Sequence, residues 1–329
     1  MKTFINQNAR DMKHAASLAA QARAKGQSAA FSGGGSDLLQ MVKERIAEPD
    51  VLVNLRSVKN NDQVTVVDDG VNIGGLITLD ALSQHSVIQR GYSVLAEAAG
   101  SVATPQIRNF GTLAGNVCQR PWCWYYRNGF KCFKAGGNQC FSINGENQFH
   151  AILGGGPSFI VHPSDTAPAL VALGAIFHLT GPSGERTLSA ADFFVLPKQN
   201  AARENALRED EVLASIHLPS TKANIRSAYH KVMDREAWTH AVVSAAIVLD
   251  MDKDVCKDAR IVLGGVAPIP WRVPQAERIL AGQRITDDLA KKAAELALQG
   301  ATPLAKNAYK IPLTKTIVQR TLMNVAALA

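Results

Sequence analysis

The chain has 329 residues, of which 47% are hydrophobic and 19% are charged, with a net charge of +7. These proportions are ordinary for a globular protein and exclude a disordered chain. No apolar run reaches the roughly 20 residues that a membrane-spanning helix needs, and the N-terminus lacks the apolar core of a secretory signal, so we expect a cytoplasmic protein. Lysine and arginine are scattered, which argues against a nucleic-acid site.

Hydrophobic patterns in the first third predict mixed α and β structure. Residues 11–25 have the pattern of an amphipathic helix, and VLVNLRSV (51–58) has that of a strand. The segment 62–82 predicts a β-hairpin that leads into a helix, with Asp69-Gly70 as its turn signal. Residues 88–108 are predicted to be helical.

The same alternation continues to a polar segment, STKANIRS (220–227), where we place a domain boundary. Before it, residues 150–181 predict strand, turn, helix and strand, and VLASIHLP predicts a further strand. Beyond it, long strands are expected over 229–252 and 259–273. The predicted helices of the C-terminal third are 275–282, 287–299 and 314–328.

Three loops rich in small residues lie between these predicted elements. The first, Gly33-Gly34-Gly35-Ser36-Asp37, lies between a short strand and a helix, where backbone N–H groups can surround a phosphate. It has neither the G-x-G-x-x-G fingerprint of dinucleotide-binding folds nor the Gly-Lys-Ser/Thr of a P-loop. By itself it is equally well explained as a flexible turn.

The second loop is RNFGTLAGN (108–116), and the third is His162-Pro163-Ser164-Asp165 before a predicted helix. Asp165 alone is explained equally well as a helix N-cap. Three such loops in one region favour a large phosphate-bearing cofactor.

Four motifs in this order, SGGGSDLL, RNFGTLAGN, HPSDTAPAL and LGGVAPIPWR, resemble the FAD-binding medium subunits of the molybdenum hydroxylases. This family includes xanthine dehydrogenase, aldehyde oxidoreductase and carbon monoxide dehydrogenase. The resemblance implies an α+β chain with a two-subdomain FAD-binding domain of vanillyl-alcohol-oxidase (PCMH) type over residues 1–222. Its subdomains are expected at about 1–58 and 59–222. A C-terminal α+β domain like that of the carbon monoxide dehydrogenase flavoprotein is expected over 223–329.

The same resemblance implies which residues contact FAD. Lys231 is assigned with His230 as the alternative if the register shifts by one, and Leu213 is equally well explained as a core residue. The implied set is Phe31, Ser32, Gly33, Gly34, Gly35, Ser36, Asp37, Leu38, Thr112, Gly115, Asn116, Asp165, Leu213 and Lys231.

Four of the five cysteines lie close together in CQRPWCWYYRNGFKCFKAGGNQC, at Cys118, Cys123, Cys132 and Cys140. In a reducing compartment, such a cluster favours a metal site over disulfides. Cys256 lies elsewhere and is expected to be an unliganded thiol.

The segment carrying these cysteines resembles an insertion, about 118–155, found in a subset of the family. Members of this subset include 4-hydroxybenzoyl-CoA reductase and the periplasmic aldehyde oxidoreductase, whose medium subunits hold a 4Fe-4S cluster there. Their fourth ligand cysteine lies shortly before the Ser-Asp loop, where this chain has Phe159, so Cys118 is the candidate fourth ligand. A zinc site and free thiols are the alternatives.

The tryptophans and tyrosines of the insertion, Trp122, Trp124, Tyr125 and Tyr126, have two interpretations. They shield a cluster from solvent, or they are packing anchors for the insertion or a partner. No histidine is assigned a catalytic role.

The resemblance implies an oxidoreductase subunit that transfers electrons through FAD. A large molybdopterin subunit and a small subunit with two 2Fe-2S clusters are the expected partners, in a heterotrimer or its dimer. A partner with a twin-arginine signal would carry the complex to the periplasm. A stand-alone FAD oxidase of the same superfamily is the alternative function, and a zinc-stapled nucleic-acid binder leaves the three loops unexplained. The substrate and the electron acceptor are not readable from this chain.

Overall fold

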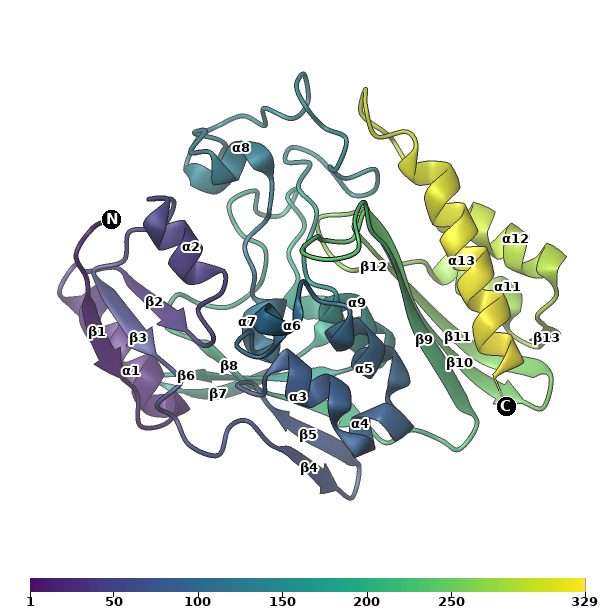
Figure 1. The fold of residues 1–329 in the computed structure, drawn as a ribbon, viewed down its shortest axis with the longest axis horizontal. Coiled ribbons are helices and arrows are strands. Elements are labelled where there is room, and N and C mark those ends of the chain that lie inside the picture. Colours follow the sequence, from purple (N-terminus) through teal and green to yellow (C-terminus); the bar gives the residue numbers. More distant parts are fainter. Residues whose placement is uncertain (329) are drawn as a thin grey trace.

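The computed structural model describes residues 1–328, which form three sheets and the helices around them (Figure 1). The N-terminal sheet is parallel, in the order β1-β3-β2, and α1 packs against it through buried alanines. Asp11 caps α1 by accepting a hydrogen bond from the His14 amide at 2.7 Å. Its elements are β1 (Ile5–Asn8), α1 (Met12–Ala24), β2 (Ala29–Ser32), α2 (Leu38–Lys43) and β3 (Val51–Asn54).

The central sheet is antiparallel, in the order β4-β5-β8-β6-β7. The middle strand, β8, follows β5 in the sheet but comes about 140 residues later in the chain. The chain between β5 and β8 carries the short helices that cover the sheet. The strands are β4 (Val64–Val67), β5 (Gly70–Gly74), β6 (Ile176–Gly181), β7 (Gly184–Ser189) and β8 (Val212–Pro219). The helices are α3 (Leu79–Gln84), α4 (Ser86–Gly91), α5 (Ser93–Gly100), α6 (Pro105–Arg108), α7 (Leu113–Val117), α9 (Thr166–Ala172) and α10 (Ala190–Phe193).

The C-terminal sheet lies between two helical layers. Helices α5 and α9 pack on one face, and α13 covers the other with α12 and α11 beside it (Figure 1). Every residue of α9 is buried, which explains why its sequence is apolar on all sides. The elements are β9 (Ile225–Val232), β10 (Val243–Asp252), β11 (Val255–Gly264), β12 (Trp271–Arg272), β13 (Gln283–Arg284), α11 (Pro274–Leu280), α12 (Asp287–Ala297) and α13 (Lys310–Ala327).

The predicted α+β fold class is confirmed, and most predicted elements are present. The turn of the first hairpin is Asp68-Asp69, because Gly70 already pairs with Val67. The predicted helix 88–108 is divided into α4, α5 and α6, since the backbone leaves the helical region at Tyr92.

The strand predicted at the start of 150–181 is absent: in the described chain, residues 151–161 form an irregular loop. Its backbone does not form a ladder. The amides of Ile152 and Leu153 both donate to the Val266 carbonyl, and the Ala151 amide donates to the Phe159 carbonyl within the same loop. Tertiary bonds to a neighbouring loop therefore replace the strand pairing that the apolar pattern suggested.

The cysteine-rich insertion (residues 118–155) rises above the sheets between α2 and the start of α13 (Figure 1). Its regular elements are α8 (Trp124–Arg127) and a 3₁₀ turn, η1 (Phe133–Ala135). Lys134 is buried and lies 2.9 Å from the buried carboxylate of Glu204, and Lys134 Nζ also donates to the Arg203 carbonyl at 2.8 Å. The insertion is thus anchored to the central part of the chain by a buried charge pair.

Candidate functional site

Two of the three loops meet in a cleft of about 230 Å³, which we call the glycine cleft. The loop after β2 approaches the loop before α7 so closely that a Cβ on Gly34 would lie 1.8 Å from the Phe110 carbonyl oxygen. A Cβ on Gly33 would lie 2.8 Å from Thr112 Oγ1. Glycine is therefore required at both positions, and the backbone amides stay open to a ligand.

The predicted residues of these two loops all line the glycine cleft. They are Phe31, Ser32, Gly33, Gly34, Gly35, Ser36, Asp37, Leu38, Thr112, Gly115 and Asn116. Thr112 also caps α7 by accepting a hydrogen bond from the Gly115 amide at 3.2 Å. Small residues and amide donors converge here from segments about 75 positions apart.

Two of these side chains bind protein groups at the edge of the cleft. Asp37 accepts hydrogen bonds from Arg127 Nη2 at 2.7 Å and from the Arg120 amide at 3.2 Å, which ties the insertion to the cleft. Asn116 Oδ1 accepts from the hydroxyls of Ser164 and Thr166, at 2.6 and 2.7 Å. Asn116 therefore joins the second loop to the Ser-Asp loop.

The third loop holds a buried charge pair. Asp165 Oδ2 lies 2.7 Å from Lys231 Nζ, and Asp165 Oδ1 accepts a hydrogen bond from the Tyr229 hydroxyl at 2.7 Å. Lys231 also donates to the Ser101 and Thr239 carbonyls. Burial and the nearby Asp165 raise the pKa of Tyr229 well above its usual value, so the phenol keeps its proton.

The structure bears on two pairs of alternatives from the sequence, while contact with a cofactor stays a prediction. Asp165 makes no capping hydrogen bond to α9, and Ser164 accepts from the Ala167 amide instead. His230 lies 3.1 Å from Thr321 on α13, whereas Lys231 binds Asp165. Successive residues of a strand point to opposite faces, so Lys231 is the residue on the Asp165 side.

Leu213 is buried in the hydrophobic core of the central part and lines neither the glycine cleft nor the larger cavity described next. Its placement fits the core interpretation, and direct contact with a cofactor stays a prediction. Tyr229 was not predicted. Its position two residues before Lys231, on the same strand face, is the signal that could have found it.

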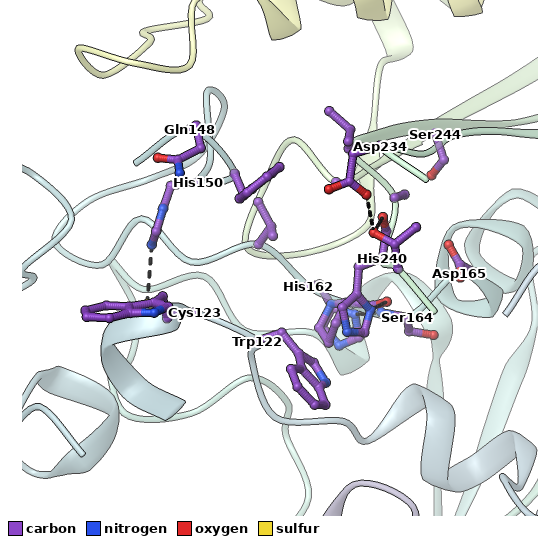
Figure 2. Close-up of a pocket in the computed structure, with 18 of the residues that line it drawn as sticks. Trp122, Cys123, Gln148, His150, His162, Ser164, Asp165, Asp234, His240 and Ser244 are labelled. Carbon is purple, nitrogen blue, oxygen red and sulfur yellow. Dashed lines mark hydrogen bonds between the residues drawn. The ribbon is translucent and has the colours of Figure 1, made fainter. Parts of the chain in front are cut away.

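A cavity of about 360 Å³, the aromatic cavity, lies between the insertion, the Ser-Asp loop and the β9–β10 connection (Figure 2). The rings of Trp122 and His240 are 5.2 Å apart, and the Arg127 guanidinium lies 4.3 Å from the centre of the Trp122 ring. Asp165 and Ser164 line its inner side, so the cavity adjoins the buried charge pair. Its lining residues come from segments far apart in the sequence, so no local sequence pattern could have predicted the cavity.

Three histidines, His150, His162 and His240, line the cavity, and burial lowers the pKa of each, so all three are neutral near pH 7. Burial lowers the pKa of His162 to about 3, with a smaller contribution from Lys134. Burial also lowers the pKa of His240.

The four clustered cysteines have two different surroundings. Cys123 and Cys132 belong to one apolar cluster with Met41 and Tyr126. Burial raises the pKa of Cys123 to about 11, with smaller contributions from the nearby Cys140 and Cys132. Cys118 ends α7, packs against the core of the central part and lines the glycine cleft. Within residues 1–328, no three His, Cys, Asp or Glu side chains lie close enough to hold a metal ion as they stand.

Comparison with known proteins gives matches along nearly the whole chain. Residues 6–221 match the family described as the FAD binding domain in molybdopterin dehydrogenase. Residues 228–325 match the carbon monoxide dehydrogenase flavoprotein C-terminal domain. The domain boundary expected at 222–223, within the polar segment 220–227, stays a prediction.

Two curated relatives and one solved structure illustrate these matches. The aldehyde oxidoreductase FAD-binding subunit PaoB of Escherichia coli K12 is 34% identical over 91% of this chain and 91% of its own length. The carbon monoxide dehydrogenase medium chain of Afipia carboxidovorans is 28% identical over 83% and 78%. The structure of carbon monoxide dehydrogenase from Hydrogenophaga pseudoflava superimposes with a TM-score of 0.77 at 26% identity, over 98% and 96% of the two chains.

Proposed function

This chain belongs to the family of FAD-binding subunits of the molybdopterin dehydrogenases, and from that premise we propose that it carries electrons through FAD within such a complex. The observation that carries the proposal is the glycine cleft, where two distant loops leave backbone amides open around one cavity. Amides arranged in this way favour the charged pyrophosphate of a dinucleotide. When bound, FAD supplies the redox chemistry, because the isoalloxazine accepts and donates electrons.

The residues of this chain bind and orient the cofactor. Gly33, Gly34 and Thr112 form the part of the cleft that would hold the pyrophosphate, because the two loops can approach this closely only where neither glycine carries a side chain. Asn116 fixes the position of the Ser-Asp loop relative to the cleft. From this arrangement of the two loops, we propose that FAD contacts the predicted residues that line the glycine cleft.

The Asp165–Lys231–Tyr229 group supplies a fixed charge arrangement beside the aromatic cavity. Each of the three side chains is buried and hydrogen-bonded, which favours a fixed arrangement of the group. We propose that this group sets the local electrostatic environment of the flavin, which is the usual contribution of a protein to flavin chemistry. No side chain of this chain is proposed to act as a catalytic acid or base.

A large molybdopterin-binding subunit and a small iron–sulfur subunit are the proposed partners, since relatives are named as medium chains. Aldehydes are the first substrate class to test in the assembled complex, because the relative at 34% identity is named an aldehyde oxidoreductase. Among residues 1–328, no helix has the length and apolar character to cross a bilayer. The cytoplasmic compartment stays a prediction.

An additional 4Fe-4S cluster is the finer part of the proposal, and it rests on the likeness of the insertion to those of a subset of the family. The set Cys118, Cys123, Cys132 and Cys140 does not fit such a cluster as it stands, because Cys118 packs against a different core from Cys123 and Cys132, and no three metal-ligating side chains of residues 1–328 lie close enough together. We derive no electron-transfer step through this group.

The test is the flavin content of the purified chain, measured by absorbance after release from the protein. We expect equimolar FAD in the wild type and the loss of most of it in Gly34→Ala, whose new Cβ would meet the Phe110 carbonyl at 1.8 Å. Gly91→Ala is the matched control, because its Cβ would meet no atom closer than Thr221 Oγ1 at 3.5 Å. A wild-type chain without flavin, or an equal loss in both variants, would overturn the proposal.

A further inference from the structure

The first residues of the cysteine-rich insertion form part of the wall of the glycine cleft. Gln119 and Arg120 both line it, and Arg120 is the only lysine or arginine that does so in the part of the chain that the structure describes. Neither residue belongs to the two loops that the sequence predicted to bind FAD. The Arg120 amide donates to Asp37 Oδ2 at 3.2 Å, so the backbone at this point is fixed to the cleft itself.

Both side chains have a buried polar atom that the protein does not satisfy. Among residues 1–328, Arg120 Nε and Gln119 Oε1 are buried without a hydrogen-bond partner. Arg120 Nε lies 3.3 Å from Glu204 Oε2, but this charge contact does not have the geometry of a hydrogen bond. One atom is a donor and the other an acceptor, and buried polar groups normally have partners. A ligand that offers both an acceptor and a donor would satisfy them.

The charges around Arg120 leave one positive charge in surplus. The Glu204 carboxylate is shared by two cations, because it lies 2.9 Å from Lys134 Nζ and 3.3 Å from Arg120 Nε. Asp37, the one acidic side chain that lines the described part of the cleft, is paired with Arg127 at 2.7 Å. Three cations therefore face two carboxylates, and an anion in the cleft would balance the remaining charge.

The insertion also holds the Arg120 guanidinium in place. Arg120 Nη2 donates to the Lys134 carbonyl at 3.0 Å, and the guanidinium lies 5.1 Å from the centre of the Tyr126 ring. These contacts exist before a ligand binds and leave Nε free. A side chain that is already ordered loses less conformational entropy when the ligand arrives.

We propose that Arg120 binds the pyrophosphate of the dinucleotide in the glycine cleft and that Gln119 accepts a hydrogen bond from one of its hydroxyl groups, an inference that rests on the proposed function. Pyrophosphate supplies acceptor oxygens and negative charge, and guanidinium groups suit phosphate oxygens in geometry and charge. The sugar and ribityl hydroxyls of FAD supply the donors. The insertion then gives the cofactor a cationic contact that the lining residues of the two glycine-rich loops lack.

The test is the dissociation constant for FAD, measured by flavin fluorescence on the full-length chain after its flavin has been removed. We expect the Kd to rise at least about tenfold in Arg120→Gln, because a hydrogen bond between two charged groups is lost. Lys134 keeps Glu204 as its partner in this variant, so no buried charge is left uncompensated. Arg120→Lys keeps the charge but not the planar fork, so its Kd should lie between the two.

Two further variants complete the series. Gln119→Leu removes one neutral hydrogen bond and should raise the Kd by about two- to tenfold. Arg284→Gln is the matched control, because it removes the same charge from an exposed pair with Asp254, 3.4 Å away in the C-terminal part of the chain. Its Kd for FAD should equal that of the wild type. An unchanged Kd in Gln119→Leu would exclude the Gln119 contact.

Riboflavin, which lacks the phosphates, separates a direct contact from a structural effect. Its affinity should be equal in the wild type and Arg120→Gln, and FAD binding should depend less steeply on salt in that variant. An equal loss of affinity for riboflavin and FAD would contradict a contact with the pyrophosphate. If Arg120→Gln does not fold, Arg120→Lys decides by the same comparison.

The remaining outcomes separate this inference from the proposed function. A wild-type chain that binds FAD, together with an unchanged Kd in Arg120→Gln, would overturn the inference and leave the proposed function standing. A wild-type chain that binds no FAD would overturn both.

Discussion

The glycine cleft and the cysteine-rich insertion lie next to each other, yet they are built by opposite means. The cleft is formed by backbone approaching backbone, so its shape is fixed by the absence of side chains at Gly33 and Gly34. The insertion has little regular structure and is held by charges, through Lys134 and Glu204 on one side and Asp37 with Arg127 on the other. The shape of the cleft therefore depends on backbone geometry, whereas the position of the insertion depends on ion pairs that a single substitution can break.

The largest expected effect comes from breaking the charge pair that anchors the insertion. Glu204→Ala leaves the buried Lys134 ammonium without its carboxylate partner and also removes the carboxylate 3.3 Å from Arg120. Removing one member of a buried pair costs about 3–5 kcal/mol. We expect the insertion to become sensitive to limited proteolysis while the glycine cleft keeps its flavin.

The control for this prediction is the exposed pair of Arg23 and Glu209, 3.0 Å apart. Glu209→Ala should change the free energy of unfolding by no more than about 1 kcal/mol, as exposed pairs do. Equal effects of the two substitutions would show that the insertion is not held by the buried pair.

A smaller effect is expected in the buried group beside the aromatic cavity. Tyr229→Phe removes a hydrogen bond to the Asp165 carboxylate, and bonds to charged groups contribute about 1.5–3 kcal/mol. Tyr92→Phe is the matched control, because the Tyr92 hydroxyl donates to the neutral Pro219 carbonyl at 3.0 Å. Denaturant unfolding should show the larger loss for Tyr229→Phe, and the reverse order would mean that the Asp165 network is not a fixed unit.

The last prediction concerns the pH dependence of stability and the lysine that holds the His150 segment. Lys310 Nζ donates to the Phe149 carbonyl at 2.9 Å. Burial lowers the pKa of Lys310 to about 7, from 10.5, so the folded chain binds fewer protons there than the unfolded chain between these values. Stability should therefore rise with pH from about 7 to 10, by at most about 1.4 kcal/mol per pH unit.

Lys310→Met should flatten this rise, and thermal unfolding across the pH range measures it. A profile equally steep in Lys310→Met would assign the pH dependence to other groups. The lysine also donates to the Gly265 carbonyl at 2.6 Å, so the variant loses hydrogen bonds at every pH, and the slope is the quantity to compare.

Local pattern predicted much of the fold, because helices and strands leave a periodic signal. The helix at 11–25 appears as Met12–Ala24, and the strand VLASIHLP appears as Val212–Pro219. The strand expected near residue 151 failed for a tertiary reason, since Ile152 and Leu153 bond to the Val266 carbonyl of another loop. An apolar run cannot reveal which partner its amides will find.

The sequence by itself determined the cleft-forming glycines, the Ser-Asp loop and the cysteines, because residue type alone carries their chemistry. Only the tertiary structure decided that Lys231 rather than His230 faces Asp165, that Tyr229 completes their group, and that Cys118 and Cys123 lie in different cores. It also brought His150 to Cys123 across 26 intervening residues. The physical reason is that ion pairs, orphaned polar atoms and metal ligands depend on distances between segments, and these distances exist only after the chain has packed.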